Sequence, residues 1–146
     1  MMKSMIKENG VTFKQLEKNI FIWICQIGQE FTKDFLERYD RMLMKERDKK
    51  KYRNKGTRKT TIKTIYGEVT YQRAVYKVTG EDGLRHFVYL LDENLDLGNV
   101  GLISTNLTEL LVKGITELSY RECAKKVSEM TGQTISPWEC GMSSRR

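Results

Sequence analysis

Apolar and polar positions follow a helical period over the first third of the chain. From Phe13 onward the apolar residues recur at intervals of three and four, with Lys, Glu and Gln between them. The positions concerned are Phe13, Leu16, Ile20, Trp23, Ile24, Ile27, Phe31, Phe35, Tyr39 and Met42. This spacing predicts an amphipathic helix that fills most of residues 1–44 and runs from about Thr12 to the mid-40s. The apolar face either packs on the rest of the protein or pairs with the same helix of a second copy in a homodimer.

The period changes to that of β-structure after residue 60. Residues 60–65 and 69–78 are rich in Thr, Val, Ile and Tyr, and Tyr66-Gly67-Glu68 separates them. A second turn signal at residues 80–83 precedes a third apolar, aromatic segment at residues 84–91. Residues 60–97 therefore predict a three-stranded antiparallel meander, with Val69, Tyr71, Arg73 and Val75 on one face at period two.

The last part, residues 104–146, predicts three short helices. Asn106 is the expected cap of the first helix, and Ser119 opens a capping box before the second. Gly132 is placed to end the second helix, and Ser136-Pro137-Trp138-Glu139 is a further capping box. The last two helices form a helix-turn-helix pattern, although trihelical packing without DNA contact has the same spacing. The fold class is therefore α+β, with a long N-terminal helix, the meander and an incomplete helix-turn-helix-like segment.

The net charge lies in one short segment. Residues 45–59 contain nine Lys or Arg and two acids, so their local charge of +7 equals that of the whole chain. We expect a basic linker here, and its candidate DNA-binding residues are Arg47, Lys49, Lys50, Lys51, Arg53, Lys55, Arg58 and Lys59. Cations confined to one segment can neutralise neighbouring phosphates together, although a solvated linker gives the same pattern. The outer face of the meander is expected to continue this surface through Lys63, Arg73, Lys77 and Arg85, although cations that only keep an exposed sheet soluble give the same pattern.

Composition excludes several other classes. Cys25, Cys123 and Cys140 are far apart, and a single His86 is the only histidine, so neither a disulfide framework nor a zinc site is expected. The longest apolar run, residues 20–25, is too short to span a membrane. We therefore expect a cytoplasmic protein without cofactors. The acids Asp92, Glu93 and Asp96 invite a metal-site hypothesis, but the leucines among them indicate a buried connector instead.

An ordered set of short motifs resembles a known family. The set is Glu46-Arg47-Asp48, Tyr52-Arg53-Asn54-Lys55-Gly56, Arg58-Lys59-Thr60, Ile65, Gly67-Glu68-Val69, Tyr71-Gln72-Arg73, Tyr76, Val88-Tyr89-Leu90-Leu91-Asp92-Glu93, Ile103-Ser104, Ser119-Tyr120-Arg121 and Met130-Thr131-Gly132-Gln133-Thr134-Ile135-Ser136. In order and spacing it resembles the N-terminal half of the ISLre-type transposases, a family also catalogued as uncharacterised bacterial proteins. The resemblance covers roughly residues 12–136.

The resemblance implies a DNA-binding region of an insertion-sequence transposase, with the terminal inverted repeats as its double-stranded DNA partner. It adds Arg121, in the final helices, to the candidate DNA-binding residues. The catalytic domain of the family has no counterpart here, and residues 137–146 depart from the recognition-helix pattern. We therefore expect no catalytic residue and no enzymatic activity, and the chain is interpreted as a truncated product of an interrupted gene or a retained regulator.

The alternative function is that of a small basic RNA-binding or ribosome-associated protein. A cationic run beside an aromatic sheet suits stacking on single-stranded bases. That hypothesis requires an exposed aromatic face on the meander, formed by Tyr66, Tyr71, Tyr76, Phe87 and Tyr89.

Overall fold

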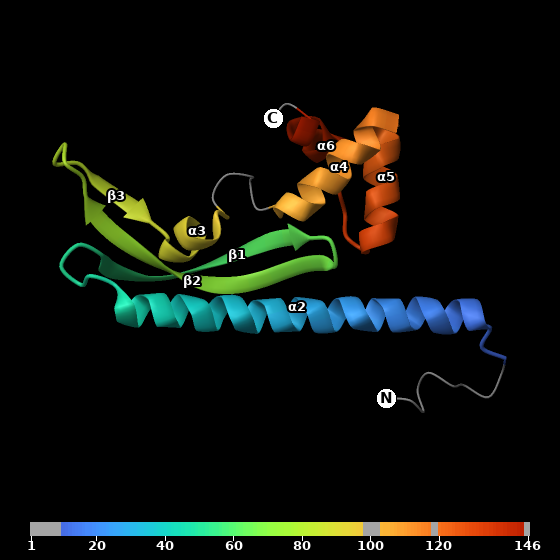
Figure 1. Cartoon of the computed structure of the whole chain (residues 1–146), viewed down its shortest axis with the longest axis horizontal. Helices are drawn as coiled ribbons and strands as arrows, with labels where there is room; N and C mark the ends of the chain where they lie inside the picture. The colour runs from blue at the N-terminus through green and yellow to red at the C-terminus, as the bar shows by residue number, and fades with distance from the viewer. Residues whose placement is uncertain (1–9, 98–102, 118–119, 145–146) are drawn as a thin grey trace.

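The computed structural model describes residues 10–97, 103–117 and 120–144 of the chain. A long helix lies along one side of a three-stranded sheet, and a group of three helices adjoins one end of that sheet (Figure 1). This arrangement confirms the expected α+β class with its N-terminal helix, antiparallel meander and C-terminal helices.

Helix α2 (Phe13–Glu46) is the longest element, as its periodicity predicts. It begins with a capping box, in which the Thr12 hydroxyl accepts from the Gln15 N–H at 3.4 Å and the Gln15 side chain accepts from the Thr12 N–H at 3.2 Å. Such a reciprocal pair satisfies two N–H groups that would otherwise have no partner in the first turn. The helix ends at Arg47, where the backbone becomes extended.

Strands β1 (Arg53–Thr64), β2 (Gly67–Thr79) and β3 (Arg85–Val88) form the sheet in the order β1-β2-β3. The first turn consists of Ile65 and Tyr66, because Thr64 pairs with Gly67. Gly67 has a φ of 125° and lies so close to the Gln29 side chain that a Cβ atom would clash with it. The basic segment expected as a linker at residues 45–59 is instead part of α2, a turn and β1.

Two carboxylates of α2 bind the backbone of β2. Glu37 accepts a hydrogen bond from the Gln72 N–H at 3.1 Å, and Asp40 accepts one from the Ala74 N–H at 2.9 Å. The side chains of Leu36 from α2 and of Val69 and Tyr71 from β2 belong to the core between helix and sheet. The helix therefore contributes both apolar contacts and hydrogen-bond acceptors to the sheet.

The expected apolar face of α2 is not the face that packs on the sheet. Among its described residues only Leu36 and Asp40 are fully buried, with Tyr39 and Leu43 partly buried beside them. Most residues of the predicted stripe are exposed: Phe13, Ile20, Trp23, Ile24, Ile27, Phe31, Phe35 and Met42. Periodicity shows how apolar residues repeat around a helix, but it does not show which face packs. In α2 it identified an exposed apolar face, and the face that packs on the sheet is a different one.

Helix α3 (Leu90–Leu95) was not expected from the sequence, which assigned this segment to the third strand and a connector. Leu90 and Leu91 are buried, and Asp96 ends the helix in the left-handed conformation with a φ of 51°. The interpretation of a buried connector is confirmed for Leu91, and Leu95 and Leu97 are partly buried beside the same core. The connector is helical over Leu90–Leu95.

Helices α4 (Thr105–Glu117), α5 (Tyr120–Thr131) and α6 (Pro137–Ser144) share a second core, which includes Leu107, Leu111, Cys123 and Cys140. The cap of α4 is Ser104 and not Asn106, because the Ser104 hydroxyl accepts from the Leu107 N–H at 3.2 Å. The Ser119 capping box falls partly on residues 118–119, outside the described residues.

The remaining signals in this part are confirmed. Gly132, with a φ of 67°, follows the last residue of α5. Ser136 and Glu139 form the expected capping box of α6, in which the Ser136 N–H donates to Glu139 at 2.7 Å and the Glu139 N–H donates to Ser136 at 3.2 Å. Helix α6 nevertheless continues to Ser144, into the segment where the sequence pattern broke.

Candidate nucleic-acid interface

The turn between α2 and β1 presents a row of lysines to solvent. Asp48 folds this turn, because its carboxylate accepts from the Lys50 N–H at 2.9 Å and the Lys51 N–H at 3.3 Å. The side chains of Lys49, Lys50 and Lys51 are exposed. One of the two acids in the basic segment thus supports the turn that displays the cations.

Arg47 has a different position from the lysines that follow it. Its guanidinium lies 5.3 Å from the centre of the Tyr76 ring, and it donates to the backbone carbonyls of Met44 and Tyr52. Contacts of this kind fix the end of α2 against the sheet. Arg47 therefore has a structural role, whether or not it also reaches a ligand.

The first half of β1 is exposed along its whole length. Residues 53–59 include the predicted cations Arg53, Lys55, Arg58 and Lys59, and all seven residues are exposed. A register shift between Asn54 and Thr57 interrupts the pairing with β2, and Gly56 adopts a φ of 103° there. This irregular, exposed strand is a surface and not a flexible linker.

The antiparallel register brings further cations to the same place. Arg53 pairs with Lys77 of β2, and Arg85 of β3 pairs with Thr79. Together with the turn they line a cavity of about 400 Å³, whose lining residues are Lys50, Lys51, Arg53, Lys77, Thr79 and Arg85. We call this cavity the cationic pocket. Among the residues that the structure describes, its walls carry five cations and a hydroxyl and no acidic side chain.

The crowding of cations at the cationic pocket changes the pKa of one of its lysines, Lys77. The positive charge of Arg85 beside it lowers the pKa of Lys77 from its ordinary value, with smaller contributions from desolvation and from Lys55 and Arg53. None of the five cations is in an ion pair with an acid in the part of the chain that the structure describes. An anion bound in the pocket would therefore meet an unneutralised positive field.

The other cations predicted on the meander are neutralised within the protein. The ammonium of Lys63 lies 2.7 Å from Glu139 and 2.9 Å from the Thr134 carbonyl oxygen, so it joins β1 to α6. The side chain of Arg73 is only 11% exposed, forms an ion pair with Asp92 and stacks over Tyr89 at 3.9 Å. The expectation that Arg73 lies on the outer face is wrong, because Arg73 shares the buried face of β2 with Val69, Tyr71 and Val75.

In the candidate helix-turn-helix, formed by α5 and α6, the first turn of α6 is in contact with the sheet. Arg121 is exposed in α5, and Trp138 in the first turn of α6 is 66% exposed. Glu139 in the same turn is paired with Lys63, however, so this turn of α6 lies against β1. In DNA-binding helix-turn-helix proteins the first turn of the second helix contacts base edges. That use is restricted here by the contact with the sheet.

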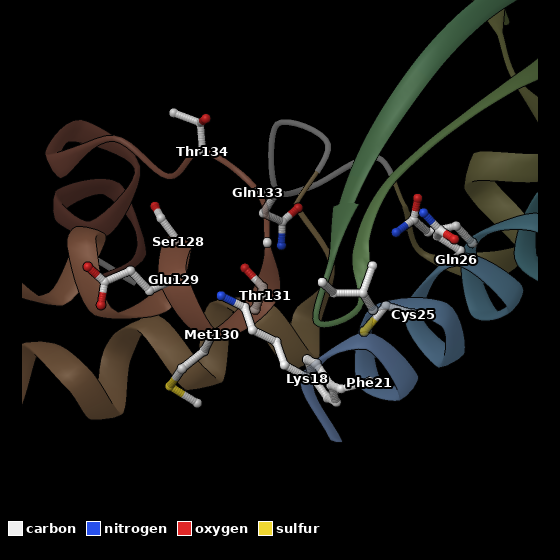
Figure 2. Close-up of a pocket in the computed structure, with 13 residues that line it drawn as sticks. Lys18, Phe21, Cys25, Gln26, Ser128, Glu129, Met130, Thr131, Gln133 and Thr134 are labelled. Carbon is white, nitrogen blue, oxygen red and sulfur yellow. The ribbon is translucent and has the colours of Figure 1, made fainter. Parts of the chain in front are cut away.

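A second cavity, of about 980 Å³, lies between α2 and the end of α5. Figure 2 shows Lys18, Phe21, Cys25 and Gln26 of α2 on one side and residues 128–134 on the other. Its lining is mixed, with Lys18 and Glu129 as its charged groups, and it does not resemble a polyanion site. Gln133 crosses beside it to donate a hydrogen bond to the Thr64 carbonyl oxygen.

The described part of the chain has no metal site, disulfide or membrane-spanning helix. No group of three or more His, Cys, Asp or Glu is arranged there to hold a metal ion. Cys25, Cys123 and Cys140 are free thiols, and burial raises the pKa of Cys140 to about 12. Of the helices the structure describes, none has both the length and the apolar character needed to cross a bilayer.

Sequence reasoning found the basic segment but missed the pocket. Lys77 and Arg85 were expected only as surface cations, since their approach to Arg53 depends on the register of three strands. The hairpin offers a partial signal, because counting outward from the Ile65-Tyr66 turn without a bulge places Lys77 opposite Asn54, next to Arg53. The register shift between Asn54 and Thr57, which only the structure shows, moves the pairing to Arg53 itself.

Comparison with known proteins identifies a family. Residues 6–140 match UPF0236, which is described as an uncharacterised protein family. One UPF0236 protein of Caldanaerobacter subterraneus subsp. tengcongensis is 28% identical over 130 residues, which are 85% of this chain and 27% of the relative. A second from the same organism is 29% identical over 129 residues, again 27% of the relative. No solved structure gives a significant match. The chain spans just over a quarter of the length of these relatives, and with a match over residues 6–140 it belongs to the UPF0236 family.

Proposed function

We propose that this chain binds double-stranded DNA through the cationic pocket and the exposed half of β1, as the DNA-binding region of a transposase-like protein. The single observation that carries the proposal is the pocket of about 400 Å³ with five cations and no acid on its walls. A phosphate group fits such a site in charge and in hydrogen bonding, since Lys and Arg donate and the Thr79 hydroxyl can do so as well.

The surface around the pocket supports a linear polyanion over a small anion. Lys49 in the turn and Lys55, Arg58 and Lys59 along β1 extend the positive charge beyond the pocket, and all are exposed. Because adjacent side chains of a strand point to opposite faces, Arg58 and Lys59 carry this charge onto both faces of β1. Cations spread over an exposed strand in this way can contact several phosphates of a duplex. The resemblance to ISLre-type transposases points to the terminal inverted repeats of an insertion sequence as the DNA.

We further propose that these residues perform no strand cleavage or joining by themselves. Such chemistry needs carboxylates from separate elements that converge on metal ions. Asp92 is instead paired with Arg73, and Asp96 ends α3.

The test measures affinity for a labelled duplex by fluorescence anisotropy at several salt concentrations. If about four to six cations contact phosphates, log K should fall against log salt with a slope of roughly −4 to −5. The triple variant Lys50→Glu, Lys51→Glu, Lys77→Glu should lose binding at moderate salt. A matched control, Lys14→Glu, Lys18→Glu, Lys33→Glu, makes the same change of charge on exposed positions of α2 and should retain most of the affinity.

Equal losses in the two triple variants would contradict the assignment of the pocket, because they would show a response to net charge alone. A separate variant, Arg121→Glu with Lys125→Glu, probes the exposed surface of α5. A loss of sequence preference in that variant, with the pocket intact, would show that the helix-turn-helix contributes to recognition.

The RNA-binding alternative is tested in the same assay with a single-stranded RNA. Its structural requirement is an exposed aromatic face, but Tyr71 and Tyr76 are buried and Tyr66 packs beside Gly28. Only Phe87 of the five aromatics is largely exposed, at 66%. Tighter binding of RNA than of the duplex at equal salt would overturn the DNA proposal in favour of this alternative.

A further inference from the structure

Helix α2 has a second apolar face that no described part of the chain covers. Its exposed members form what we call the outer stripe: Phe13, Ile20, Ile24, Ile27, Phe31, Phe35 and Met42. Phe13 is 76% exposed, Phe31 is 72% exposed and Ile24 is 56% exposed. In Figure 1 no other described helix or strand lies on the side of α2 away from the sheet. Scattered apolar residues are normal on a surface, but a continuous stripe of large side chains marks an interaction site.

The outer stripe is separate from the face that packs on the sheet. With 3.6 residues per turn, its members lie about a third of a turn around the helix from Leu36 and Leu43. The ring of Phe35 stacks on that of Tyr39, with 6.0 Å between their centres, at the boundary of the two faces. The helix thus has one apolar face inside the protein and one directed away from it.

We propose that the outer stripe is covered by the same stripe of a second copy of this chain, with the two α2 helices antiparallel. The argument is the register of the stripe, which is symmetric about the midpoint between Ile27 and Gly28. A two-fold axis at that point brings Phe13 opposite Met42, Ile20 opposite Phe35 and Ile24 opposite Phe31. The two Ile27 side chains meet beside the axis.

Two charged residues beside the outer stripe, Glu17 and Arg38, are related by the same two-fold symmetry. Glu17 and Arg38 are exposed on this side of the helix and lie equally far from the midpoint, so each copy's glutamate faces the other's arginine. A parallel pair would instead place Glu17 against Glu17 and Arg38 against Arg38. Asp34 holds the Arg38 guanidinium at 2.8 Å on the surface of the helix. Charge complementarity therefore selects the antiparallel arrangement and a second copy as the occupant.

The dimer has a consequence for the position of the cationic pockets. Each pocket lies beyond the C-terminal end of its own α2, so antiparallel helices carry the two pockets at opposite ends of the pair. With a rise of 1.5 Å per residue, the two Glu46 positions are separated by about 55 Å along the helix axes. The pairing itself is independent of DNA binding and is tested without DNA.

The first experiment measures mass in solution by light scattering after gel filtration. The wild-type chain should have twice its 17.1 kDa mass at micromolar concentration. The variant Ile24→Glu, Phe31→Glu should be monomeric, with helix content and cooperative melting retained, because neither side chain is buried within one copy. A monomeric wild-type chain would overturn the proposal.

The second experiment tests the orientation by exchange of charges. Glu17→Arg and Arg38→Glu should each raise the dissociation constant of the dimer by about tenfold, because each creates like-charged contacts at two symmetric places. The double variant should restore the wild-type value. Failure of the double variant to recover, while both single variants melt as the wild type does, would overturn the antiparallel register.

Discussion

The β1–β2 ribbon has two regions that both contain Lys and Arg side chains. In one region these cations are paired with acids, and in the other they are not. In the packed part, residues 60–73, Lys63 is bound to Glu139 and Arg73 to Asp92. At the open end, residues 53–59 with residues 77–79, Arg53 and Lys77 face each other with Arg85 beside them and no acid between them. In the sequence these positions are all Lys or Arg in a strand, with nothing to distinguish them. Whether each one has an acidic partner depends on the residues that the fold places beside it.

This comparison gives a criterion for separating structural from functional cations. Desolvation of a charge is costly unless an opposite charge and hydrogen bonds compensate for it, so a buried Arg with a carboxylate belongs to the fold. Mutual repulsion of exposed cations weakens a fold slightly, so a crowded positive pocket indicates a ligand that supplies the missing negative charge. Four predictions test whether the two regions respond to substitution as this distinction requires.

The largest effect is expected for Arg73→Ala. Removal of the guanidinium leaves Asp92, whose side chain is 13% exposed, without its ionic partner. The free energy of unfolding should fall by about 3–5 kcal/mol, as for other broken buried pairs. Urea denaturation measures this change. The double variant Arg73→Met, Asp92→Leu should recover most of the stability, and a loss below about 1 kcal/mol in Arg73→Ala would refute a structural role.

A smaller effect is expected for Asp40→Ala, at the boundary of the packed part. The variant leaves the Ala74 N–H without an acceptor and should lose about 1–3 kcal/mol of unfolding free energy. Asp40→Asn keeps an acceptor and should lose less. Burial raises the pKa of Asp40 above its ordinary value, so the folded chain binds this proton more tightly than the unfolded chain.

The pH dependence of Asp40 therefore has a definite sign. Its stabilising contribution is complete below the ordinary pKa of 3.8 and is lost as pH rises through the raised value. The stability of the wild type relative to Asp40→Asn should decline from acid to neutral pH in urea titrations. A relative stability that increases over this range would mean that hydrogen bonding outweighs burial at this site.

The ion pair of Lys63 with Glu139 should have a more modest effect. Glu139→Gln should cost about 1 kcal/mol, because both side chains keep some contact with water. Burial alone would raise the pKa of Glu139, but the Lys63 ammonium and the hydrogen bonds with Ser136 outweigh it, and the pKa is lowered. The contribution is thus present above the ordinary pKa of 4.5 and is lost as pH falls through the lowered value. Equal stability differences at pH 7 and pH 2.5 would contradict this linkage.

The smallest effect on stability is expected at the open end. Lys77→Gln removes a charge that Arg85 and its neighbours repel, so the urea midpoint should be unchanged or slightly higher. The same variant should bind duplex DNA more weakly and with a shallower salt dependence. Thr61→Val, in the packed part, is a neutral control that alters the Thr61–Thr70 hydroxyl contact of 2.8 Å without a change of charge. A large loss of stability in Lys77→Gln would place Lys77 among the structural cations.

Local patterns predicted most of the elements and few of the long-range contacts. The capping boxes at Thr12 and Ser136 and the glycine after α5 act within a few residues, so their signals are complete in the sequence. Helix α3 was missed because its buried leucines directly follow a strand, and six residues are too few to show a helical period.

The candidate site was predicted in part for the same reason. The exposed lysines of the turn follow from the density of cations between residues 45 and 59, a local property. The fates of Lys63 and Arg73 depend on Glu139 and Asp92, which are far away along the chain. The sequence also could not tell which apolar face of α2 meets the sheet, because that face contacts groups far away along the chain, among them the N–H groups of Gln72 and Ala74 on β2.

The exposed half of β1 is also an unpaired strand edge. β1 lies at the margin of the sheet, and its cations would repel the same edge of another molecule. Charged side chains on such edges are a common protection against strand-to-strand aggregation. A polyanion that neutralises Arg53, Lys55 and Arg58 removes this protection at the same time as it binds. We therefore expect the protein to remain dispersed in excess DNA that covers the edge, and to precipitate near charge equivalence with short polyanions that neutralise the edge without covering it.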